Sequence, residues 1–196
     1  INIFIDPSNN LNIEKSKYVF RTLLRNAGIP WNFINVPDNS DIIYSSSTNI
    51  DCKLIIQAEN PDLIEKSITS KNIRVVQDKE LIFLESRNKS NIMSVAENQI
   101  KIENDIITIS YLFLIGFFEE TLEKTNKIIF DDQNFILKDL DLLHKPIVNL
   151  YSLFIRNLFK ATHEYIKPWP NNKSYSVALT HDVDHPQIVK LADAAK

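Results

Sequence analysis

Residues 1–28 read INIFIDPSNNLNIEKSKYVFRTLLRNAG, a short apolar stretch followed by a segment with helical periodicity. Residues 1–5 are rich in β-branched side chains and end in turn-forming residues, which predicts an opening or edge strand. From residue 12 to residue 27 the apolar positions recur at helical spacing, and Gly28 followed by Pro30 is a typical helix stop. The stretch therefore predicts a strand followed by an amphipathic helix, the first unit of an α/β fold.

The same alternation of short apolar strands and helices continues as far as residue 84. Strands outnumber helices in the later part, which favours a mixed sheet with an antiparallel edge. The predicted fold class is therefore α/β, with a three-layer or mixed-sheet N-terminal domain. The predicted elements after Gly28 are strands at 31–36, 42–44 and 53–58, a helix at 60–68, and strands at 73–76 and 81–84.

Three further segments are predicted between residues 105 and 166. Residues 105–123 are apolar almost all round a helix but too short for a membrane span, which favours a core helix. Residues 128–137 predict a strand pair, whose Asp131-Asp132 is interpreted as a solvated turn in preference to a metal site. Pro146 begins an amphipathic helix, 146–166, which would bury one face against the sheet or a following domain. His144 and His163 flank this helix and are interpreted as surface or helix-end residues.

Composition excludes several classes of function. The chain has 196 residues, of which 44% are hydrophobic and 24% charged, so it can bury a core. A formal net charge of -3 argues against nucleic acid as a partner. Only two glycines occur, which excludes dinucleotide and P-loop sites. The lone Cys52 is expected to be a buried thiol, and without a signal peptide or membrane span in view the expected location is cytoplasmic.

The segment after residue 167 changes in character. Residues 168–173 contain two prolines and otherwise polar side chains, which predicts a linker. A β-rich run at 175–180 then leads into His181-Asp182-Val183-Asp184-His185-Pro186. In a continuing strand, Asp182 and Asp184 share one face, an arrangement in which one carboxylate could bind a divalent metal and the other accept a proton from water. A capped turn before Pro186 explains the same residues without catalysis.

The stretch from Val177 to Asp184 resembles the first motif of the polysaccharide deacetylases, carbohydrate esterase family four. The resemblance implies that Asp182 is the general base and that Asp184 is a ligand of a divalent metal, zinc. Two histidines of a later motif would complete the ligand shell of this metal. Here Val183 separates the aspartates and His185 replaces the glycine of many members. Upstream segments, from Asp105-Ile106-Ile107 to Pro168-Trp169-Pro170, are similar to an accessory domain of unknown function that precedes such deacetylase domains.

The resemblance implies an N-terminal accessory domain at 1–167, a linker at 168–173, and the truncated start of a (β/α) barrel at 174–196. The parent would be a deacetylase acting on a glycan or amino sugar, with metal bound only in the full-length protein. Its missing barrel would pack on the 146–166 helix. No later His-x-x-x-His pair follows the motif, so this chain alone is expected to be inactive.

Two other functions remain open. The N-terminal domain could be a non-catalytic module that binds a carbohydrate or a protein and is attached to an inactive deacetylase-like fold. A phosphate-binding receiver or nucleotide domain has the α/β pattern in its favour, but the scarcity of glycine and the Asp6-Pro7 turn offer nothing to cradle a phosphate.

Overall fold

The computed structural model describes residues 1–47, 51–86, 92–123, 136–167, 171 and 173. It shows an α/β fold built on a six-stranded sheet. The strands of this sheet are β1 (Asn2–Ile5), β2 (Asn32–Ile34), β3 (Ile42–Ser45), β4 (Leu54–Gln57), β7 (Met93–Val95) and β8 (Ile100–Ile102). Their order is β2-β1-β3-β4-β8-β7, and only the edge strand β7 runs antiparallel to its neighbour. The predicted mixed sheet is therefore confirmed.

The opening strand and helix form as predicted. Helix α1 (Ile13–Ala27) begins after Asn12, whose side-chain oxygen accepts a hydrogen bond from the Glu14 amide, as helix-capping asparagines do. It ends at Gly28, whose φ of 69° lies in the left-handed region. The Gly28 amide donates to the Arg25 carbonyl, which satisfies part of the helix end. Local sequence signals therefore determine both ends of this helix.

The predicted strands of the first half are confirmed, with small differences at their ends. Strands β1, β3 and β4 lie in the middle of the sheet, where the β3 residues are buried on both sides. Residues 73–84 form a separate antiparallel hairpin of β5 (Ile73–Asp78) and β6 (Leu81–Ser86). Helix α2 (Pro61–Thr69), capped by Asn60, precedes this hairpin.

Strands β7 and β8 were not predicted from the sequence. Each has only three residues, and the Ile100-Lys101-Ile102 pattern is too short to distinguish a strand from a loop. Both exist because β8 pairs in parallel with β4, and β7 then pairs with β8. Their formation therefore depends on a long-range partner that a local pattern does not reveal.

The prediction of one continuous helix over 105–123 was wrong, because the segment forms two helices. The segment divides into α3 (Ile106–Leu114) and α4 (Phe117–Glu123), separated at Gly116, whose φ is 72°. A left-handed residue interrupts the helical hydrogen-bond pattern, so the chain turns there. The core position of α3 is confirmed, because six of its nine residues are buried. In the part of the chain described, no helix is long and apolar enough to cross a membrane.

The strand pair predicted over 128–137 is wrong where the structure describes it. Ile136 and Leu137 begin a short helix, α5 (Ile136–Asp139), with both side chains buried. Residues 128–135, including Asp131 and Asp132, lie outside the described residues. The strand prediction failed because two adjacent apolar residues fit a short strand and a helical turn equally well.

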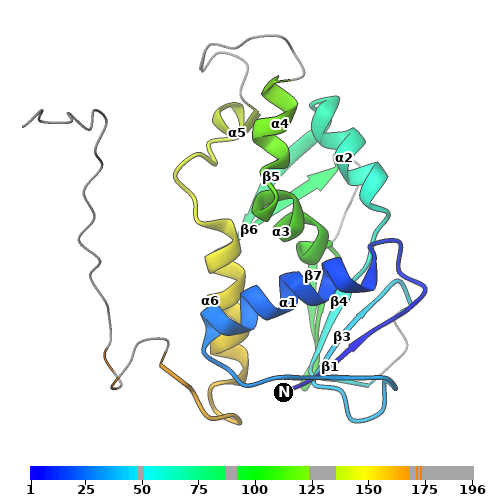
Figure 1. Ribbon diagram of the computed structural model, residues 1–196, viewed down its shortest axis with the longest axis vertical. Helices are drawn as coiled ribbons and strands as arrows, with labels where there is room; N and C mark the ends of the chain where they lie inside the picture. Colours follow the sequence, from blue (N-terminus) through cyan, green and yellow to red (C-terminus); the bar gives the residue numbers. More distant parts are fainter. Residues whose placement is uncertain (48–50, 87–91, 124–135, 168–170, 172, 174–196) are drawn as a thin grey trace, which may run out of the picture.

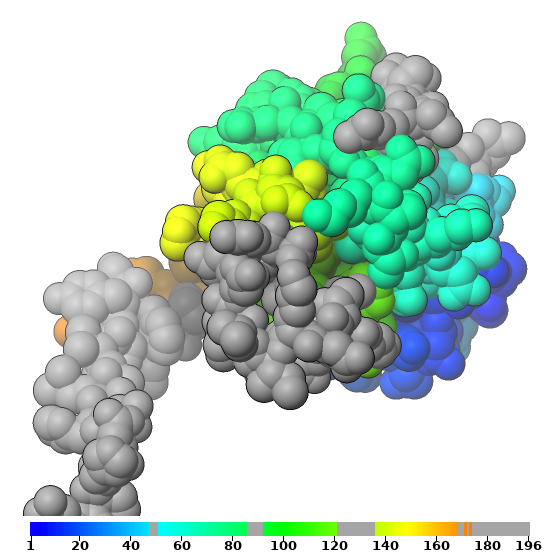
Figure 2. Space-filling view, turned by 90° about the horizontal axis from the view of Figure 1, so that it is seen from above, coloured from blue at the N-terminus to red at the C-terminus, as the bar shows by residue number. Residues whose placement is uncertain are grey.

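Helix α5 lies beside the region of α2 and β5, as Figure 2 shows. Lys71 Nζ, after α2, lies 2.8 Å from Asp139 Oδ2.

The main core lies between the sheet and three helices. Figure 1 shows α1 lying across the strands, with α6 (Ile147–Phe159) beside it and α3 above it. The predicted apolar stripe of α6 faces this core, since Ile147, Tyr151, Ile155 and Phe159 are buried. The Tyr151 hydroxyl donates to the Ile82 carbonyl over 2.7 Å. Helix α6 ends at Phe159 and does not reach the predicted residue 166. Because these four stripe residues are buried, the described part of the domain itself covers them.

The opposite face of the sheet has a smaller apolar cluster of Phe4, Ile43, Cys52 and Ile55. The expected burial of Cys52 is confirmed, because its residue is only 7% exposed. Burial raises the pKa of its thiol to about 11. The thiol is therefore almost entirely protonated at neutral pH, and it packs as a small apolar group.

Asp105 joins α3 to the ends of two strands. Its carboxylate accepts five hydrogen bonds, from the amides of Glu59, Ile107 and Thr108 and from the hydroxyls of Tyr44 and Thr108. The side chain is fully buried. Burial raises its pKa to about 6, although these hydrogen bonds act in the opposite direction.

The raised pKa of Asp105 predicts a pH dependence of stability. In the folded state the Asp105 carboxyl group binds its proton more tightly than in the unfolded state, where the pKa of an aspartate is about 3.9. The contribution of this tighter proton binding to the unfolding free energy is therefore complete below pH 4 and is lost as the pH rises through 6. We expect the difference in unfolding free energy between the wild type and Asp105→Asn, measured in urea, to be larger at pH 5 than at pH 7.5. A difference that grows with pH would contradict this prediction.

Candidate functional site

The two aspartates predicted to carry catalysis, Asp182 and Asp184, lie outside the described residues. The two upstream histidines lie on the surface, as expected. His144 is exposed, and the ring of His163 packs edge-on against Phe159 at the end of α6. Within the described ranges, no three His, Cys, Asp or Glu residues form a group that could hold a metal.

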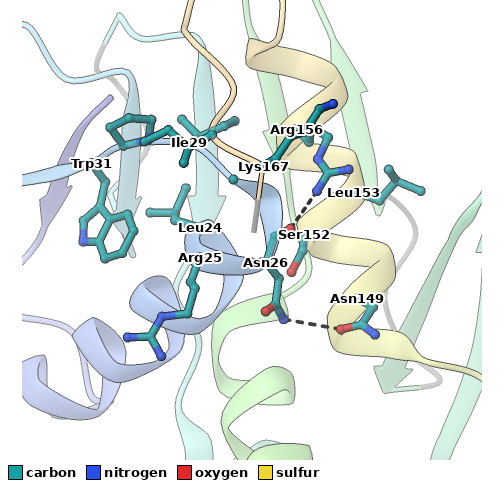
Figure 3. Close-up of a pocket in the computed structure, with 13 residues that line it drawn as sticks. Leu24, Arg25, Asn26, Ile29, Trp31, Asn149, Ser152, Leu153, Arg156 and Lys167 are labelled. Carbon is teal, nitrogen blue, oxygen red and sulfur yellow. Dashed lines mark hydrogen bonds between the residues drawn. The ribbon is translucent and has the colours of Figure 1, made fainter. Parts of the chain in front are cut away.

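A cavity of about 760 Å³ lies between the end of α1, the turn that follows it, helix α6 and the outgoing segment 165–167. Figure 3 shows side chains from all these segments around it. Its walls combine apolar side chains with amide and cationic groups. They are formed by Leu24, Arg25, Asn26, Gly28, Ile29, Pro30, Trp31, Asn149, Ser152, Leu153, Arg156, Ile166 and Lys167. We call this space the exit cavity.

Arg156, on α6, contacts two other segments around the exit cavity, the end of α1 and the outgoing segment. Its Nε donates to the Ala27 carbonyl and its Nη2 to the Asn26 carbonyl, each over 2.8 Å. The last carbonyls of a helix have no partner within the helix, and a cation there also interacts favourably with the helix dipole. The Arg156 guanidinium carbon lies 4.5 Å from the centre of the Tyr165 ring, within the range of a cation–π contact. Arg156 thus holds the end of α1 and the outgoing segment together.

Gly28 provides the surface on which the outgoing segment lies. The Ile166 amide donates to the Gly28 carbonyl over 2.7 Å. A Cβ atom at Gly28 would overlap with the Ile166 carbonyl oxygen and with the Tyr165 ring. The absent side chain at Gly28 is therefore required by a close approach of two chain segments, in addition to the left-handed φ.

The chemistry of the exit cavity favours binding over catalysis. Among the described residues of its walls, the ionisable side chains are Arg25, Arg156 and Lys167, and all three are cationic. Such a set offers no general base for water activation. Apolar contact comes from Leu153 and Ile166, which are 39% and 56% exposed. A cavity of this kind suits a polypeptide surface that combines apolar and acidic side chains.

Sequence reasoning predicted Gly28 as a helix stop and the helix that carries Arg156, but it did not identify this site. Gly28 was predicted as a helix stop, yet its contact with residues 165 and 166 joins distant segments. Arg156 lies 129 residues after Ala27, whose carbonyl it binds. Leu153 lies off the predicted apolar stripe of α6 and is exposed. The position of Leu153 outside this stripe was the sequence signal for the site, because a leucine off the buried stripe indicates a second apolar face of the helix.

Comparison with known proteins yields one match. The sequence model of a family of unknown function, DUF7033, matches residues 5–164. No curated protein and no solved structure matches the chain. The matched range begins at the last residue of β1, covers the other strands and the helices through α6, and ends immediately before Tyr165 of the outgoing segment.

Proposed function

We propose that this chain, which belongs to the DUF7033 family, acts as the N-terminal accessory domain of a metal-dependent polysaccharide deacetylase and seats the catalytic domain in the exit cavity. The observation that carries the docking role is the path of the outgoing segment. The Ile166 amide binds Gly28, and Tyr165 stacks on Arg156. Whatever follows Lys167 therefore starts at the rim of a partly apolar cavity.

The deacetylase activity rests on the resemblance of residues 177–184 to the first motif of that family. In this proposal Asp182 takes a proton from water, and Asp184 is one oxygen ligand of a divalent metal. Carboxylate and imidazole groups are usual ligands of zinc, so Asp184 and histidines of a later motif are suitable donors. Zinc, when bound, would supply Lewis-acid polarisation of the attacked carbonyl group. The substrate would be an acetylated glycan or amino sugar, and a cytoplasmic location stays a prediction.

The second candidate is a non-catalytic protein-binding module. The observation that favours it is the chemistry of the exit cavity, whose ionisable groups are all cationic. In that case the docked domain would have a deacetylase-like fold without activity. The two candidates share the docking step and differ in whether Asp182 and Asp184 act on a substrate.

The catalytic part is tested on the full-length protein with Asp182→Asn and Asp184→Asn. We expect Asp184→Asn to lose bound metal, because it removes a charged ligand. Asp182→Asn should keep the metal and lose roughly 100-fold or more of the acetate release, the usual contribution of a general base. Metal content by mass spectrometry and acetate release from an acetylated chitooligosaccharide are the measurements. Unchanged metal content in Asp184→Asn would show that the assigned roles are wrong.

The docking part is tested separately, with Leu153→Glu in the full-length protein. Leu153 is 39% exposed and lines the exit cavity, so a charge there should weaken the seating of the next domain. Leu143→Glu is the matched control, because Leu143 is 43% exposed and is not among the cavity residues. We expect Leu153→Glu alone to separate the unfolding of the two domains in calorimetry. Equal behaviour of the two variants would contradict docking, whatever the Asp variants show.

A further inference from the structure

A second, smaller cavity of about 110 Å³ lies at the ends of β4 and β8, between α2 and the β5–β6 hairpin. It shares no residue with the exit cavity. Its walls are mostly aliphatic, with four oxygen-bearing side chains among them. The residues are Glu59, Leu63, Ile64, Ser67, Ile73, Leu84, Asn104, Asp105 and Ile109. We call it the Asn104 cavity.

Asn104 contributes a buried acceptor that has no partner. The residue is 3% exposed, and its Nδ2 donates to the Leu84 carbonyl over 2.8 Å. Because Leu84 offers an acceptor, this contact fixes which side of the amide carries nitrogen. The opposite atom, Asn104 Oδ1, has no hydrogen-bond partner among the residues that the structure describes. An unsatisfied buried acceptor of this kind costs about 1–3 kcal/mol, so such an atom requires an explanation.

Two acidic side chains, Glu59 and Asp105, lie on the walls of the cavity. Asp105 and Glu59 lie beside each other, since the Glu59 amide donates to Asp105 Oδ2 and the Asp105 amide donates to Glu59 Oε1. Among the described side chains that form the walls, none is basic. A cationic hydrogen-bond donor is therefore favoured over a neutral one at Asn104 Oδ1.

The walls are unsuitable for a metal ion. Calcium requires 6–8 oxygen ligands, whereas five of the nine wall residues are aliphatic. The Asp105 carboxylate already accepts five hydrogen bonds within the protein. At roughly 30 Å³ per water molecule, the cavity has room for three or four heavy atoms. A short alkyl chain that ends in a charged nitrogen matches both the size and the walls.

We propose that the Asn104 cavity binds a primary ammonium group carried on a short alkyl chain, with Asn104 Oδ1 as its buried acceptor. The alkyl part lies against Ile64, Ile73 and Ile109. The ammonium group satisfies the acceptor that the fold leaves unpaired. This site is independent of the proposed deacetylase function and of the exit cavity.

The test uses ethylammonium chloride and the 196-residue chain, with potassium chloride, calcium chloride and ethanol as separate comparison arms. We expect ethylammonium alone to shift the side-chain amide resonances of Asn104 in a saturable manner and to raise the melting temperature. Equal saturable shifts with ethanol would overturn the charge requirement, and equal shifts with either metal salt would make this a metal site. The absence of saturation with ethylammonium would overturn the proposal and leave ordered water as the occupant.

Two variants and one control locate the site. Asn104→Leu removes the acceptor and should weaken ethylammonium binding at least 10-fold. Because this change also removes the bond to Leu84, Ser67→Leu provides an independent variant that fills the cavity from α2 and should abolish binding. Thr69→Leu makes a similar change on the exposed side of α2 and should bind like the wild type. Saturable binding that survives Ser67→Leu would place the ligand elsewhere.

Discussion

Replacing Gly28 with alanine is expected to release the outgoing segment from the domain and to lower the unfolding free energy by about 2–4 kcal/mol. The left-handed φ of 69° accounts for roughly 1–2 kcal/mol of that loss. The remainder comes from the overlap with Ile166 and Tyr165, which removes a backbone hydrogen bond of about 1 kcal/mol and the contact between Tyr165 and Arg156. Urea unfolding measures the free energy, and chymotrypsin cleavage after Tyr165 measures the release.

Gly116→Ala is the matched control for this prediction. Gly116 has nearly the same φ, 72°, but a Cβ there would meet only the Glu119 carboxylate at an ordinary distance of 3.7 Å. The control should therefore carry the backbone cost of about 1–2 kcal/mol and leave Tyr165 protected. If both variants expose Tyr165 to the protease equally, the outgoing segment is not held at Gly28. If neither variant exposes Tyr165, the structure relieves the overlap at position 28 without releasing the outgoing segment.

Asp105→Ala should be more damaging than the loss of any ordinary helix cap. Its carboxylate serves the α3 amides, the Tyr44 hydroxyl and the Glu59 amide in one fully buried position. Truncation leaves several of these donors buried without a partner, and each such donor costs about 1–3 kcal/mol. We expect a total loss of roughly 3–5 kcal/mol, which approaches the whole stability of a small domain. Urea unfolding followed by circular dichroism measures the loss.

Asn12→Ala provides the comparison for Asp105→Ala. Asn12 also caps a helix, but it is exposed and its oxygen accepts a hydrogen bond only from the Glu14 amide. Loss of an exposed cap of this kind costs about 1 kcal/mol. Losses of similar size in the two variants would show that Asp105 acts only as a local cap and does not connect β3, β4 and α3.

Predictions from the sequence were accurate where short-range signals decide the structure. Asn12 and Gly28 mark the ends of α1, and Asn60 with Pro61 marks the start of α2. Accuracy was lost where the partner is distant or the segment is short. Strand β8 requires β4, and the break at Gly116 was overlooked because the surrounding residues are uniformly apolar.

The candidate site was less predictable than the fold, for the same reason. Arg156 and Gly28 come close to each other only after α6 packs on α1. Asn104 follows a strand that was not predicted, so its position at the edge of the sheet was not predicted either. The apolar stripe of α6 was predicted correctly, and the domain itself buries it. The face of α6 that carries Leu153 is the one exposed to a partner.

The burial of Cys52 has a practical consequence. The chain has a single cysteine, and its thiol lies 7% exposed against the sheet with a pKa of about 11. Thiol reagents attack the thiolate, so the folded chain resists them at neutral pH. A fluorophore can therefore be attached through a newly introduced surface cysteine without removal of Cys52. Conversely, the rate at which a thiol reagent modifies Cys52 in the unaltered chain measures how often the sheet opens.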